Sequence, residues 1–251
     1  MLPSSVVKTG LYDKLSIQRN DPHSVKISNH QLFSFILSLL FSHLITAQET
    51  DDPRRWQADI DKFAAADALA PVKPEPILFV GSSSIVFWES LAEDFPNVNT
   101  LNRGFGGSQF SDLLYWADRV IFKYRPRAIF VYEGDNDVNA GDRPRRILRE
   151  AKKLRRLISK NLGKEVPVYF ISPKPSIARW QLKAQYEATN RLLEQYTLRK
   201  KFTYFIDVWN PALDASGAVL SDIFVEDQLH MNAKGYAIWA EVIRPWVEQL
   251  Q

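Results

Sequence analysis

Residues 77–88 read ILFVGSSSIVFW. The first four, Ile77–Val80, form an unbroken apolar run, which is typical of a strand that is buried on both faces. The proline-rich segment 71–76 precedes this run, and the small residues Gly81–Ser84 follow it. Proline and glycine at these positions mark chain breaks and turns. The stretch therefore predicts a short buried strand followed directly by a turn of small polar residues.

Strand-like and helix-like segments alternate downstream of this strand. Further strands are predicted at 100–103, 128–132, 166–171 and 202–207, and the run 128–132 is fully apolar. Helices are predicted at 51–70, 108–124, 144–161, 180–199 and 233–250. Strands that alternate with helices of this length indicate a parallel sheet covered on both faces. We therefore predict an α/β fold, a three-layer α/β/α sandwich with a parallel, flavodoxin-like sheet of about five strands.

Composition excludes several classes of protein. The 251 residues are 45% hydrophobic and 24% charged, which are ordinary values for a globular domain. Cysteine is absent, which excludes disulfides, thiolate metal sites and a cysteine nucleophile. The net charge is only +3, and the basic run 143–160 has no interleaved aromatic residues. We therefore expect a solvated cationic helix face in that run, and no nucleic-acid partner.

The N-terminal part of the sequence differs from the rest. Its apolar run of about 14 residues, Leu32–Ile45, is shorter than a membrane span of about 20 residues but has the length of a signal-peptide core. Ala47 is the small residue that a signal peptidase prefers. The alternative is an N-terminal helix that is buried or lies on the surface. We predict that residues 1–47 are an extension with a signal peptide. Residues 48–251 would then form one exported domain, periplasmic or secreted, with a core that begins near residue 77.

Export of the domain would leave it a single histidine. Three of the four histidines lie in residues 1–47, so imidazole chemistry in the exported domain would have to use His230. Asp227 stands three residues before it. At this spacing a carboxylate can hold one ring nitrogen while the other nitrogen takes a proton from a hydroxyl group. The alternative interpretation is a solvent-exposed loop histidine.

Three of the predicted strands end in residues suited to acyl transfer. The turn Gly81–Ser84 can bind an anion on its amides or expose a serine nucleophile. The glycine-rich segment 102–108 can direct backbone N–H groups at an oxyanion, and Asn136 can add a side-chain amide. Each segment has a plainer interpretation as a turn. The acidic segment 133–137 could also hold a divalent metal, although no histidine or regular carboxylate spacing completes a ligand shell.

Together these segments resemble the SGNH hydrolases, also called the GDSL esterase/lipase family, from about Ile77 to Leu250. The family's Gly-Asp-Ser-Leu block corresponds to residues 81–84, with serine in place of its Asp and Leu. Its glycine block corresponds to the N-x-G-x-G-G run at 102–107, which is similar to that of platelet-activating-factor acetylhydrolase catalytic subunits. Its G-x-N-D block corresponds to 134–137. The resemblance implies the catalytic residues Ser83, Asp227 and His230 and the oxyanion-hole residues Ser83, Gly107 and Asn136.

The resemblance also implies a function. It predicts a serine esterase that hydrolyses short-chain esters, such as acetyl esters, through an acyl-enzyme, with no metal or organic cofactor. Expected substrates are small-molecule esters or acylated carbohydrates, and no stable membrane span is expected after processing. An acyltransferase would use the same triad, and a non-catalytic binding module could use the same loops, although it has no need of Ser83, Asp227 and His230 together. An α/β-hydrolase elbow, G-x-S-x-G, is disfavoured because Ile85 occupies its second glycine position.

Overall fold

The computed structural model describes residues 52–250. The predicted extension 1–47, with its signal peptide, lies outside the described residues. Among the described helices, none combines the length and the apolar character that a membrane crossing requires.

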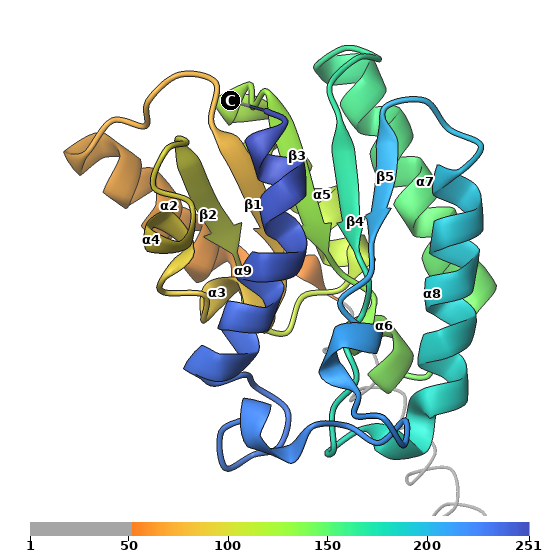
Figure 1. Ribbon diagram of the computed structural model, residues 1–251. Coiled ribbons are helices and arrows are strands. Elements are labelled where there is room, and N and C mark those ends of the chain that lie inside the picture. The colour runs from red at the N-terminus through yellow and green to blue at the C-terminus, as the bar shows by residue number, and fades with distance from the viewer. Residues whose placement is uncertain (1–51, 251) are drawn as a thin grey trace, which may run out of the picture. The chain divides into compact units, whose positions relative to one another are not determined.

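Five parallel strands form the sheet at the centre of the described part (Figure 1). They are β1 (Ile77–Gly81), β2 (Thr100–Gly104), β3 (Ala128–Tyr132), β4 (Val168–Ile171) and β5 (Thr203–Ile206). Their order is β2-β1-β3-β4-β5, and every neighbouring pair is parallel. This is the flavodoxin-like order. The prediction of a parallel sheet of about five strands is confirmed.

Helices cover both faces of the sheet. One face packs against α2 (Gln57–Leu69), α5 (Phe110–Val120), α7 (Pro144–Asn161) and α8 (Lys183–Thr197). The other face packs against α9 (Ala233–Glu248), with α4 (Leu91–Asp94) and the short α3 (Ser83–Val86) beside it. Figure 1 shows α9 running across the front of the sheet. The three-layer prediction is therefore confirmed. Helices of four or five residues, such as α3 and α6 (Asp135–Asn139), are too short to leave a period in the sequence.

Side chains that alternate along the strands supply two cores, one for each face. Under α9, four aromatic rings form a row across the strands, from Phe79 through Phe130 and Tyr169 to Tyr204. Their successive centroids are 4.6, 4.5 and 4.9 Å apart. Stacked pairs of this kind stabilise a core by about 0.5–1.5 kcal/mol each beyond the area that they bury. This row packs across four of the five strands, from β1 to β5.

One residue of the basic helix α7 contradicts the expectation of a fully solvated cationic face. Arg155 is only 1% exposed and points into the protein. Its guanidinium donates to Thr203 Oγ1 and to the Lys164 carbonyl oxygen, each at 2.8 Å. Burial lowers its pKa. The prediction was wrong at this position because polar partners on β5 and in the α7–β4 loop satisfy a charge that the sequence pattern assigns to solvent.

The topology brings three loops to one edge of the sheet. The chain leaves β1 toward β2 on one side and later returns to β3 on the other side of β1. Segments that follow β1, β2 and β3 therefore start at the same edge, at the point where the strand order reverses. Ligands bind at such points in open α/β sheets.

Candidate active site

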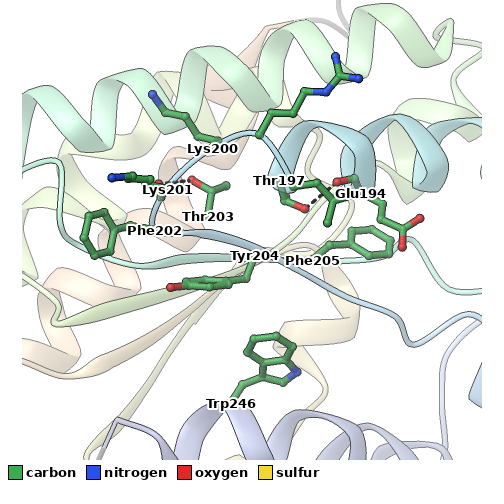
Figure 2. A pocket seen from close by; sticks show the side chains of 11 residues that line it. Glu194, Thr197, Lys200, Lys201, Phe202, Thr203, Tyr204, Phe205 and Trp246 are labelled. Carbon is green, nitrogen blue, oxygen red and sulfur yellow. Dashed lines mark hydrogen bonds between the residues drawn. The ribbon is translucent and has the colours of Figure 1, made fainter.

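Two of the larger cavities in residues 52–250 differ in what they contain. The larger one, about 670 Å³, follows the edge strand β5 and is lined on one side by Trp246 of α9 (Figure 2). It contains none of the residues predicted for the site. A second cavity, of about 530 Å³, is bordered by Asp227 and His230 and by Phe87, which follows α3. Two of the residues with predicted chemistry, Asp227 and His230, thus border the second cavity.

Ser83 is the accessible member of its serine run. The strand β1 ends at Gly81, whose φ is +140°. A Cβ there would lie 2.0 Å from the Tyr132 carbonyl oxygen, so only glycine fits. The chain then turns into α3 at Ser83, which is half-buried, whereas Ser82 and Ser84 are 2% and 3% exposed. Of the three hydroxyl groups, that of Ser83 is the one that opens to the site.

Asp227 and His230 are held in one tight turn. One carboxylate oxygen of Asp227 accepts hydrogen bonds from the backbone amides of Leu229 and His230, each at 2.9 Å. Gln228, the residue that follows Asp227, has a φ of +58°, which the turn requires. Asn232 caps α9 through its Oδ1 and donates its Nδ2 to the Phe224 carbonyl oxygen, which ties the loop to the helix. The turn leaves the second oxygen of Asp227 for the imidazole.

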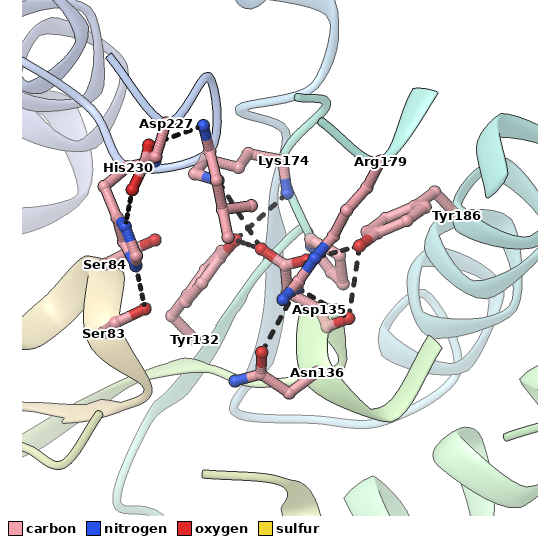
Figure 3. A network of polar contacts seen from close by, with 12 residues as sticks. Ser83, Ser84, Tyr132, Asp135, Asn136, Lys174, Arg179, Tyr186, Asp227 and His230 are labelled. Carbon is pink, nitrogen blue, oxygen red and sulfur yellow. Dashed lines mark hydrogen bonds and ion pairs between the residues drawn. The ribbon is translucent and has the colours of Figure 1, made fainter. Parts of the chain in front are cut away.

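The structure brings Ser83, His230 and Asp227 into one line (Figure 3). The distance from His230 Nε2 to Ser83 Oγ is 3.0 Å, and that from His230 Nδ1 to Asp227 Oδ2 is 2.5 Å. Partial burial raises the pKa of Asp227, but the amides of His230 and Leu229 and the imidazole outweigh it and lower the pKa to about 2. Asp227 is therefore an anion throughout the neutral range and can support a positive charge on the imidazole.

The two other predicted donors come from loops that are bonded to each other. Asn136 donates Nδ2 to the Ser108 carbonyl oxygen at 2.9 Å, and the Gln109 side chain donates to the Asn136 carbonyl oxygen at 3.3 Å. The glycine loop passes close to the serine, because a Cβ on Gly106 would lie 3.9 Å from Ser83 Cβ. Within residues 52–250 the amides of Ser83 and Gly107 have no hydrogen-bond acceptor. These amides and Asn136 Nδ2 therefore offer N–H groups for a bound oxyanion.

Trp56 was missed by the sequence analysis as part of this region. The 3₁₀ turn Pro53–Trp56 precedes α2, and its tryptophan ring lies against Gly107, whose φ is +79°. A Cβ on Gly107 would be 3.2 Å from the ring. Trp56 therefore leaves little space beside the glycine loop for a large group.

A buried cluster around Asp135, also missed, lies next to Asn136 (Figure 3). Arg179 Nη1 is 2.6 Å from Asp135 Oδ1, and Lys174 Nζ is 3.5 Å from Asp135 Oδ2. The Tyr132 hydroxyl donates to Asp135 Oδ2 at 2.8 Å, and the Tyr186 hydroxyl donates to Asp135 Oδ1. Burial raises the pKa of Asp135, but Lys174 and Arg179 outweigh burial and lower it. We name these five residues the Asp135 cluster.

Two further acids lie beneath the glycine loop. Glu133 is 1% exposed and accepts a hydrogen bond from Ser108 Oγ at 2.6 Å, while its Oε2 has no partner among the described residues. Burial, followed by the charge of Asp137, raises the pKa of Glu133 well above its usual range. Burial also raises the pKa of Asp137, to about 7. Within residues 52–250 no group of three acidic or histidine side chains is arranged to hold a metal ion.

The raised pKa of Glu133 predicts a pH-dependent stability. An unfolded chain loses this proton near pH 4.5, whereas the folded protein retains it to higher pH, so the free energy of unfolding falls as pH rises between the two values. Glutamine imitates the neutral acid and cannot ionise. We expect Glu133→Gln to gain stability relative to the wild type as pH increases, as measured by urea unfolding at about pH 4 and about pH 8. Equal pH slopes would show that Glu133 is ionised in the folded protein.

Comparisons with known proteins agree with the family resemblance of the sequence motifs. Residues 80–238 match the model of the GDSL-like lipase/acylhydrolase family. A Streptococcus pneumonia protein whose structure is named for platelet activating factor is 19% identical, with a TM-score of 0.66 over 85% of this chain and 98% of that one. A GDSL-like lipase from Bacteroides thetaiotaomicron is 17% identical, with a TM-score of 0.65 over 77% and 99%. A catalytic mutant of an acetylxylan esterase from Geobacillus stearothermophilus is 14% identical, with a TM-score of 0.54 over 68% and 93%. The sequence has no significant match among curated proteins.

Proposed function

The chain belongs to the GDSL-like lipase/acylhydrolase family, and we propose that it is a serine esterase for short-chain, chiefly acetyl, esters of carbohydrates. One observation carries the proposal: a hydroxyl, an imidazole and a carboxylate stand in sequence at 3.0 and 2.5 Å. This arrangement lets an imidazole take a proton from a serine while a fixed anion holds its tautomer. It is the geometry that a serine nucleophile requires.

In the first half of the reaction, Ser83 Oγ attacks the ester carbonyl carbon as its proton passes to His230 Nε2. The carbonyl oxygen becomes an oxyanion. When the tetrahedral intermediate collapses, the bond to the alcohol oxygen breaks, and Nε2 returns the proton to the leaving alcohol. The acyl group remains as an ester on Ser83.

In the second half, water replaces the alcohol. His230 Nε2 takes a proton from the water as its oxygen attacks the acyl carbon, and the proton then goes to Ser83 Oγ as the acid leaves. Asp227 keeps Nδ1 as the protonated nitrogen and stabilises the imidazolium in both halves. Its pKa of about 2 means that it stays ionised while it does so.

Three donors are available to the oxyanion in each half: the amides of Ser83 and Gly107 and the side chain of Asn136. All three are held by the local fold and need no rearrangement as negative charge develops. Donors fixed in this way are worth about 10²–10³ in rate each.

The surroundings of His230 support a carbohydrate as the leaving alcohol. The cavity of about 530 Å³ lies beside the imidazole that protonates the alcohol. It offers the apolar side chains Phe87 and Val225, which are 47% and 44% exposed, next to the polar Glu89 and Ser90. A sugar presents both C–H faces and hydroxyl groups and fits such a mixed lining. The related acetylxylan esterase structure adds support from the same fold.

The packing of Trp56 against Gly107 of the proposed oxyanion hole supports a preference for short acyl groups. The Trp56 ring lies against Gly107, and the glycine loop passes close to Ser83, so we infer that the acyl group binds in a small space between them. We expect the purified protein to hydrolyse p-nitrophenyl acetate at least about tenfold more efficiently, in kcat/KM, than the octanoate ester. It should also release acetate from acetylated xylooligosaccharides. The release of p-nitrophenol and acetate measures both reactions.

An added alcohol acceptor separates hydrolysis from acyl transfer. If acetate release is unchanged by the acceptor, water is the second substrate, as proposed. If the acetyl group moves to the acceptor instead, the protein is an acyltransferase with the same triad. If no ester is cleaved at all, the enzyme proposal fails.

A further inference from the structure

The side-chain amide of Asn136 has a fixed orientation. Its Oδ1 accepts a hydrogen bond from Arg179 Nη1 at 3.2 Å, and its Nδ2 donates to the Ser108 carbonyl oxygen at 2.9 Å. A reversed amide would set two donors against each other at Arg179 and two acceptors against each other at Ser108. These two contacts therefore determine which end of the amide faces each neighbour. The second hydrogen of Nδ2 stays available for an oxyanion.

Arg179 is itself held in place. The same Nη1 lies 2.6 Å from Asp135 Oδ1 and 3.4 Å from the Asp135 carbonyl oxygen (Figure 3). The carboxylate is fixed in turn by Tyr132, Tyr186 and Lys174. Asp135 and Lys174 are 5% and 2% exposed. An arginine anchored on a buried carboxylate has little freedom to leave the amide that it orients.

The charge on Arg179 adds to the effect of its position. A guanidinium at Oδ1 polarises the amide and makes the N–H groups at the other end stronger donors. The polarisation matters most when negative charge develops on the substrate oxygen, so it should favour the transition state over the bound substrate.

We propose that Arg179 is a positioning residue of the oxyanion hole, acting through Asn136. This inference rests on the proposed function of Asn136 as an oxyanion donor. In this proposal Arg179 does not contact the reacting atoms. It holds and polarises the Asn136 amide, which binds the oxyanion.

A double-mutant cycle tests the proposal. We expect Arg179→Gln to lower kcat for p-nitrophenyl acetate by about tenfold with little change in KM, and by no more than the loss of about 10²–10³ expected for Asn136→Ala. In the Asn136→Ala background, the same change should cost less than about twofold, because its target is gone. Arg179→Lys, which keeps the charge, should recover part of kcat. Arg146→Gln, which breaks an exposed ion pair with Asp142, serves as the matched control with unchanged kcat.

The outcomes are distinct. Equal losses in the two backgrounds, or an unchanged kcat in Arg179→Gln, would overturn the proposal. The fold should tolerate the variants, because Lys174 still pairs with Asp135 in each of them. Arg179→Met, which also removes the guanidinium charge, allows the same cycle if Arg179→Gln proves unstable.

NMR spectroscopy tests the orientation of the Asn136 amide by Arg179 without an activity assay. The Asn136 side-chain amide can be assigned in ¹⁵N–¹H spectra by its disappearance in Asn136→Ala. We expect Arg179→Gln to shift its resonances and Arg146→Gln to leave them in place. An unshifted amide in Arg179→Gln would contradict the positioning role. If the wild type cleaves no ester but this shift occurs, the proposed function fails while the orientation of Asn136 by Arg179 stands.

Discussion

Replacing Ser83 by alanine should lower kcat for p-nitrophenyl acetate by about 10⁴-fold or more, because the variant has no oxygen on which to form the acyl-enzyme. The change removes one half-buried oxygen atom and leaves the packing of β1 and α3 intact. We therefore expect an unchanged melting temperature. Steady-state kinetics and thermal unfolding measure the two effects.

The neighbouring serines are the matched controls for this result. Ser82→Ala and Ser84→Ala remove the same atom from buried positions on either side. Both should keep most of the activity, because His230 Nε2 is bonded to Ser83 and to neither neighbour. If one of them proves to be the inactive variant, the nucleophile has been assigned to the wrong serine.

Replacing His230 by alanine should have an effect as large as that of Ser83→Ala, because no other imidazole lies among residues 52–250. The Ser83→Ala/His230→Ala double variant should lose little more than either single variant, since the residues act as one unit. Asp227→Asn should cost less, because its role is orientation and charge support. The kcat values of the four variants test this order.

Independent losses would give a different pattern. If the effects of Ser83→Ala and His230→Ala multiply in the double variant, the two residues act in separate steps or at separate sites. If His230→Ala remains active, another group takes the serine proton and the mechanism proposed above is wrong.

Strand positions and motif order could be predicted from the sequence because each depends on local pattern. Apolar runs such as Ala128–Tyr132 have few interpretations other than a buried strand, and the structure has that strand with the same bounds. The motif residues at the ends of β1, β2 and β3 could be placed at one edge of the sheet because parallel strands end together. The family resemblance drawn from these motifs is confirmed by the match over residues 80–238.

The Asp135 cluster could not be predicted in the same way, because it depends on contacts between loops that are distant in sequence. Asp135 and Arg179 are bonded across 44 residues, and Asp135 and Tyr186 across 51. One signal was available. Functional residues in parallel sheets often follow the carboxyl ends of strands, and Lys174 follows Ile171, the last residue of β4, by three residues. Nothing in the sequence pattern distinguishes Arg179 from the exposed arginines of α7, just as nothing marked Arg155 as buried.

Labelling with a fluorophosphonate tests the central claim most directly, because this reagent forms a covalent bond with a serine only where that serine is activated as a nucleophile. After digestion, mass spectrometry of the labelled peptides identifies the modified residue. The proposed mechanism predicts a single label on Ser83, which is lost in His230→Ala while Ser82→Ala and Ser84→Ala retain it. A label on another serine, or no label on the folded wild-type protein, would contradict the assignment of Ser83 as the catalytic nucleophile.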